Sequence, residues 1–100
     1  MENDVEHIYV EFHNRARELF FSLFKKFNSS IEGVNRDRDE FIFRKQREQY
    51  ITHLEQELKE IARDIITKHR QSQNLGLLSQ NLQQYTADYL HQFIQKIKAL

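Results

Sequence analysis

Hydrophobic residues recur along this chain at intervals of three and four positions, the spacing of one face of an α-helix. In the first segment, about residues 3–30, Asn3 and Glu6 have the spacing of a capping box, and Gly33 follows as an exit signal. The apolar positions of this segment are Val5, Ile8, Tyr9, Phe12, Ala16, Leu19, Phe20, Leu23 and Phe27. The pattern predicts a long amphipathic helix.

A second helix is predicted over about residues 37–73. Asp37 and Glu40 give its start signal, and Asn74 and Gly76 give its end. In its second half the apolar residues alternate three and four apart, which is a heptad seam. They are Ile51, Leu54, Leu58, Ile61 and Ile65. The first half is different, because Phe41–Phe43 precede six polar residues, Arg44–Gln49. There we expect the helix to leave the core, and its continuity through those six residues is left open.

A third amphipathic helix is predicted over about residues 79–99. One face of this segment carries Leu82, Tyr85, Tyr89, Phe93 and Ile97. Short connections make successive helices antiparallel neighbours, so residues 1–100 are expected to form a single all-α domain, an up-down-up bundle of three helices. At about 1.5 Å per residue the second helix would measure roughly 50 Å and the third roughly 30 Å. Part of the second helix would therefore protrude.

Composition supports a helical protein of a reducing compartment. The chain has no proline and two glycines, and its lack of cysteine excludes disulfides, thiolate metal ligands and a cysteine nucleophile. Its 15 basic and 15 acidic residues balance, so no net charge attracts nucleic acid or an anionic membrane. Unbroken apolar runs reach only three residues and the first residues are acidic, so neither a transmembrane segment nor a secretory signal is expected. These features favour a cytoplasmic protein.

Histidines and carboxylates three or four positions apart suggest metal ligands on one helical face. The pairs are Asp4 with His7, His7 with Glu11, His53 with Glu57, and Asp88 with His91. In the predicted bundle, however, the pair on the third helix lies roughly 10 to 15 Å further along than the first pair. No glycine-framed serine or glycine-rich phosphate loop is present either. We therefore expect no metal site, no cofactor, no catalytic residue and no enzymatic activity.

The apolar surface is wider than one helix seam requires. Val10, Phe21 and Phe24 lie beside the main stripe of the first helix. Two explanations are open: a broad core that contacts two neighbouring helices, or an interface with another molecule. We favour a non-enzymatic protein–protein interaction or assembly module that binds a protein partner or itself. The preferred form is a homodimer through the first helix and the protruding part of the second. Its aromatic anchors would be Phe20, Phe21, Phe24, Phe41 and Phe43.

A basic cluster around the first turn indicates the alternative, a small nucleic-acid-associated regulator. Its possible phosphate contacts are Arg36, Arg38, Arg44, Lys45 and Arg47. Acidic residues between them, including Asp37, Asp39 and Glu40, reduce the local field. Nucleic-acid binding is therefore the second hypothesis, after protein–protein interaction.

Overall fold

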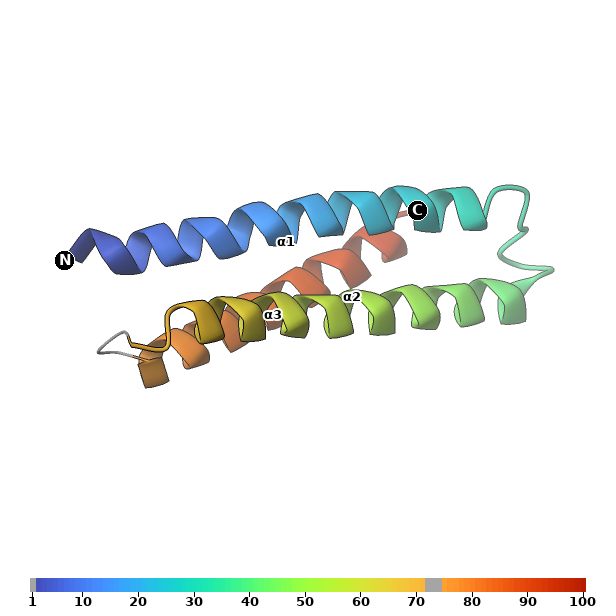
Figure 1. Ribbon diagram of the computed structural model, residues 1–100. Coiled ribbons are helices and arrows are strands. Elements are labelled where there is room, and N and C mark those ends of the chain that lie inside the picture. Colours follow the sequence, from blue (N-terminus) through green and yellow to red (C-terminus); the bar gives the residue numbers. More distant parts are fainter. Residues whose placement is uncertain (1, 72–74) are drawn as a thin grey trace.

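A computed structural model describes residues 2–71 and 75–100, with side chains from residue 6 onward. This described part forms three α-helices: α1 (Glu2–Ser30), α2 (Glu40–Lys68) and α3 (Leu75–Lys98). Figure 1 shows α1 and α3 running in one direction and α2 in the other. The molecule is elongated, measuring 55 × 18 × 17 Å. The predicted all-α, up-down-up bundle is confirmed.

The core lies along the common axis of the three helices and takes one apolar stripe from each. Its fully buried members from α2 are aliphatic, whereas α1 contributes mainly phenylalanine. The largest completely buried side chains are Phe12, Phe27, Phe93, Leu54, Leu58, Ile65, Leu82 and Ile97. Burying a side chain of this size contributes about 1.5–3 kcal/mol. Packing of these stripes is what holds such long helices together.

The start of α2 differs from the prediction. The Asn35 side-chain oxygen accepts backbone N–H groups from Asp37 and Arg38, at 2.9 and 3.0 Å, so these residues form a turn. The helix therefore begins three residues later, after Asp39, and the predicted cap at Asp37 is wrong. Gly33 has a φ of 80°, a left-handed conformation that suits glycine in this turn.

The connection between α2 and α3 is also shifted. The His69 N–H donates to the Ile65 carbonyl and caps α2 after Lys68. The predicted end near Gln73 and Asn74 lies outside the described residues. Helix α3 begins at Leu75 instead of Ser79 because its apolar stripe starts earlier, with Leu78 buried. Gly76 thus lies inside α3 and does not end a helix.

Helix α2 is continuous through the polar residues 44–49 and stays against α1. Phe43 and Tyr50 flank this run, and their rings both pack against Phe27, with centroids 5.9 and 5.6 Å apart. The expectation that the helix leaves the core here is therefore wrong. Figure 1 shows α3 ending short of the α1–α2 turn, in keeping with its 24 residues against 29 in each of the other helices.

Candidate interaction surface

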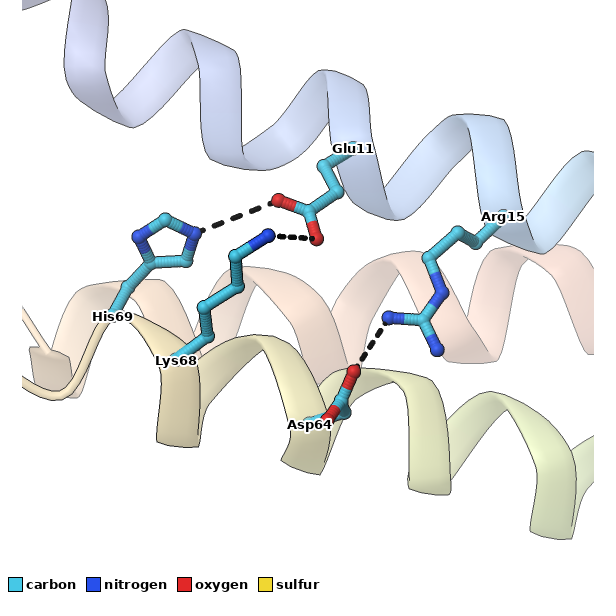
Figure 2. A network of polar contacts seen from close by, with 5 residues as sticks. All are labelled: Glu11, Arg15, Asp64, Lys68 and His69. Carbon is cyan, nitrogen blue, oxygen red and sulfur yellow. Dashed lines mark hydrogen bonds and ion pairs between the residues drawn. The ribbon is translucent and has the colours of Figure 1, made fainter.

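The edge between α1 and α2 is closed by ion pairs (Figure 2). Arg15 Nη1 lies 2.7 Å from Asp64 Oδ2, and Lys68 Nζ lies 3.3 Å from Glu11 Oε2. His69 Nε2 lies 3.5 Å from the other Glu11 oxygen. Burial alone would raise the pKa of Glu11, but hydrogen bonds and charges from Lys68 and His69 outweigh it and lower that pKa. This edge is polar and already paired within the chain.

The contact between α1 and α3 is built from aromatic rings. Phe20 meets Phe93 edge to face at 5.4 Å, and Tyr9 meets Tyr85 in the same way at 5.5 Å. Large rings between two helices keep their backbones apart, and α1 and α3 do approach each other closely at fewer positions than the other two helix pairs. The α1–α3 contact is therefore the widest of the three.

Polar atoms of this aromatic contact are paired across the two helices. Asn81 Nδ2 donates to the Tyr9 hydroxyl at 2.7 Å, and His13 Nδ1 lies 2.8 Å from the Tyr89 hydroxyl. Burial, and then the positive charge of Arg17, lower the pKa of His13, which keeps its imidazole neutral at neutral pH. The floor between α1 and α3 is thus an apolar surface with satisfied polar atoms.

A groove of about 870 Å³ lies over this aromatic floor, and we call it the α1–α3 groove. Phe21 forms part of its wall and is 60% exposed. Charged side chains of both signs also line it, from Arg17 on α1 and from Asp88 and Lys96 on α3. The other lining residues are His13, Phe20, Tyr85, Tyr89, His91, Gln92, Gln95 and Ala99. An open apolar trough with charged walls has the form of a surface that receives another helix.

The five phenylalanines predicted as partner anchors fall into different environments. Phe20 and Phe43 are each only 6% exposed and belong to the bundle's own core. Phe24 is half-buried, with its ring edge-on to Phe93 and Lys96 Nζ lying 4.5 Å from its centroid. Phe21 and Phe41 are 60% and 75% exposed. Phe21 and Phe41 are therefore available to a partner, whereas Phe20 and Phe43 are not.

The sequence reasoning missed the α3 half of the groove. Asp88, Gln92 and Lys96 repeat every fourth position, which places them on one helical face beside Tyr85 and Tyr89. That spacing is visible in the sequence. Without α1 beside it, however, such a face is typical of an ordinary solvated helix surface.

The basic residues predicted to contact nucleic acid lie at the end of the bundle that holds the α1–α2 turn. The Arg36 guanidinium stacks 4.6 Å from the Phe43 ring centroid and donates to the Leu100 carbonyl, and Arg44 pairs with Glu40 at 2.9 Å. Arg38 and Lys45 are exposed, and Arg47 is half-buried. Two of the five are thus already engaged within the chain.

Metal ligands do not gather in the described part of the chain. Among those residues, no group of three or more histidine, aspartate or glutamate side chains is placed to hold an ion. Asp4, predicted as a partner of His7, has a side chain outside the described set. His53 and Glu57 form an exposed i,i+4 pair at 3.5 Å. None of the described helices is long and apolar enough to span a bilayer.

Comparison with protein-family models, with curated proteins and with solved structures finds no match for this chain.

Proposed function

We propose that this chain is a non-enzymatic helical protein–protein interaction module that associates with a second copy of itself through its aromatic-rich helix faces. The α1–α3 groove is the site of this association. The proposal is supported by the shape of the groove, by its apolar floor and by the exposed ring of Phe21 in its wall.

The exposed ring of Phe21 is the observation that carries the proposal. Full burial of an exposed phenylalanine side chain contributes roughly 1.5–3 kcal/mol. Phe21 packs edge to face against Phe20 at 5.7 Å, so its exposed surface continues the buried aromatic layer outward. A partner that covers Phe21 would therefore extend an existing core, and aromatic residues in such positions carry much of the binding energy in protein interfaces.

The test is the solution mass, measured by light scattering over a range of concentrations. The intact chain is expected to exceed its monomer mass of 12.2 kDa as concentration rises. The Phe21→Glu variant is expected to stay monomeric and helical, because its side chain is exposed and its removal leaves the core intact. A chain that stays monomeric at every concentration would contradict the proposal.

Ile42→Glu is the matched control. Ile42 is 49% exposed, so the substitution also removes exposed apolar surface and adds one negative charge. The side chain of Ile42 does not line the α1–α3 groove. This variant is expected to associate like the intact chain. Equal loss of association in both variants would mean that general surface hydrophobicity is responsible and the groove is not.

A second candidate function is nucleic-acid association through the basic cluster. The bond from Arg36 to the Leu100 carbonyl favours it, because this contact shows that the chain end that follows Lys98 lies within reach of the basic cluster. An Arg44→Glu, Arg47→Glu variant tests it. If phosphates are contacted, retention on immobilised DNA falls steeply with salt and is lost in the variant. Retention unchanged by the variant would exclude this cluster.

A further inference from the structure

We propose that two copies of the chain pack groove to groove in antiparallel orientation, about a twofold axis that passes level with Leu19 on α1 and Gln92 on α3. This inference rests on the proposed self-association and specifies its geometry. It follows from the register of the two helices and from the positions of the groove's charged and aromatic side chains.

The register of α1 and α3 follows from their aromatic contacts, whose sequence offsets centre on 73 and range from 69, for Phe24 and Phe93, to 77, for Phe12 and Tyr89. Phe12 lies beside Tyr85, with ring centroids 6.3 Å apart, and Phe20 lies beside Phe93 at 5.4 Å. Because the two helices run in the same direction, with α3 inclined to α1, positions with the same sequence offset lie at about the same height along the bundle. The same offset puts Leu19 level with Gln92. An axis at this height therefore acts on both walls of the groove at once.

On α3, the charges are arranged symmetrically about that axis. Asp88 and Lys96 stand four positions before and four positions after Gln92, on one face of the helix, and all three line the groove. When α3 packs antiparallel against the α3 of a second copy, each Asp88 faces a Lys96 of that copy. Two complementary ion pairs form, and Gln92 meets its own symmetry mate.

On α1, the same axis pairs a cation with an aromatic ring. Arg17 and Phe21 stand two positions before and two positions after Leu19, and both line the groove. Antiparallel packing of α1 against its copy places each Arg17 guanidinium over the exposed face of a Phe21. A guanidinium within about 6 Å of a ring centroid is attracted to the ring and covers it. Within the chain, Gln84 Nε2 donates to Asp88 at 3.1 Å and Lys96 Nζ lies 4.5 Å from the Phe24 centroid, but both charged side chains are exposed and accessible to a second copy. One axis thus gives the charged and aromatic side chains of both helices a partner.

The area of this face lies near the lower end of the range for stable interfaces, about 600–1,000 Å² per partner. With α3 about 36 Å long and the molecule 18 Å wide, the face measures roughly 650 Å² in projection, before the depth of the groove is counted. Standard interfaces bury about 800 Å² per partner. A twofold contact of this kind is closed, so it predicts dimers and no larger assemblies.

The test uses complementary charge reversal. Asp88→Lys alone places the new lysine of each copy opposite Lys96 of the other copy. Lys96→Asp alone places the new aspartate of each copy opposite Asp88 of the other copy. Each variant is expected to show a dimer dissociation constant raised by about tenfold or more. In a heterodimer of the two variants, the introduced lysine faces the introduced aspartate, and the native Asp88 faces the native Lys96. An equimolar mixture is therefore expected to form heterodimers with nearly the affinity of the intact chain.

The double variant Asp88→Lys, Lys96→Asp checks the same pairing within one chain and is also expected to regain dimerisation. These residues lie two helical turns apart, so they cannot rescue each other inside one molecule. Circular dichroism confirms that each variant is folded. If the intact chain dimerises but neither the mixture nor the double variant recovers affinity, the antiparallel geometry is wrong while self-association stands.

One competing geometry has its own signature. A parallel dimer would set Arg17 of one copy against Asp88 of the other, so Asp88→Lys would be rescued by Arg17→Asp and not by Lys96→Asp. That result would overturn the inference. A monomeric intact chain would instead contradict the proposed function itself.

Discussion

The two edges of α1 are built in contrasting ways. Toward α2, aliphatic side chains close the core and ion pairs close the rim, with Arg15, Glu11, Asp64 and Lys68 already matched within the chain. Toward α3, aromatic rings fill a wider gap, tyrosine hydroxyls take the polar contacts, and Phe21 remains exposed beside a groove. The chain itself pairs the charges of the first edge, whereas the second edge leaves the ring of Phe21 exposed, beside charged side chains that have only exposed contacts within α3 or with α1.

This difference follows from side-chain shape. Aliphatic side chains such as Leu54, Leu58 and Ile65 interdigitate, so α2 lies close to its neighbours. Rings pack edge to face at 5 to 6 Å and hold two helices further apart, as Phe20 and Phe93 do. A wide contact between parallel helices leaves a trough above it. Aromatic packing in the core thus generates the surface feature on which the proposed function depends.

The largest expected effect comes from removing the central ring of the aromatic edge. Phe93 is completely buried and contacts both Phe20 and Phe24. Phe93→Ala is expected to lower the free energy of unfolding by about 3–5 kcal/mol, through lost burial and the cavity left behind. Denaturant titration measures it, and a loss under about 1 kcal/mol would show that α3 is not held by this ring.

Removing the Tyr89 hydroxyl has a smaller expected effect. Tyr89→Phe keeps the ring but leaves the half-buried His13 Nδ1 without its hydroxyl partner. The expected loss in unfolding free energy is about 1 kcal/mol. Tyr85→Phe is the matched control, since the described contacts of Tyr85 are through its ring. Equal losses in the two variants would argue against the His13 contact.

The free energy of unfolding is expected to fall as the solution becomes mildly acidic, because the contact between α1 and α3 contains His13. The pKa of His13 is lowered in the folded state by burial and by Arg17, so folding favours the neutral imidazole. This contribution is complete above the ordinary histidine pKa of 6.5 and is lost as pH falls through that value toward the lower folded-state pKa. Denaturant titrations at about pH 7.5 and about pH 5.5 measure it.

His13→Gln is the control for this pH effect. Glutamine carries no titrating group, so the variant should lose less stability over the same pH interval than the intact chain. The pKa of Glu11 is also lowered, but its contribution is lost only as pH falls through its ordinary value of 4.5, which is below this interval. An identical pH dependence in the intact chain and the variant would rule out His13 as the cause.

The smallest expected effect belongs to the ion-paired edge. Arg15 and Asp64 lie 2.7 Å apart but remain 42% and 64% exposed, so solvent screens their attraction. A double-mutant cycle with Arg15→Ala and Asp64→Ala is expected to give a coupling energy of about 0.2–1 kcal/mol. A coupling well above this range would contradict the expectation that solvent screens this exposed ion pair.

Much of the fold could be predicted from the sequence, because an amphipathic helix must bury its apolar stripe and the three stripes were visible. The helix starts were less accurate: the side chain of Asn35 organises a turn where Asp37 had the expected capping pattern. Burial at the stripe's margin could not be predicted either. Phe21 and Phe24 both lie beside the main stripe, and only the position of α3 decides that Phe24 is half-buried against Phe93 while Phe21 stays exposed.

The candidate site could be predicted only on its α1 side. Phe21 was identified because its apolar surface lies beside the main stripe. Asp88, Gln92 and Lys96 could not be assigned to the groove, because they line it only when α3 lies beside α1. A groove between two helices forms only when they pack together. The sequence shows the surface pattern of α1 and of α3 separately, but it does not show that the two surfaces lie side by side.

The most direct test of the central claim is a dilution series followed by two-dimensional amide NMR. Docking of a second copy into the α1–α3 groove predicts concentration-dependent shifts at groove positions, including Arg17 and Phe21 on α1 and Asp88 and Gln92 on α3. The outer face of α2, around Thr52 and Gln56, should not change. Shifts confined to α2, or no concentration dependence at all, would contradict the account.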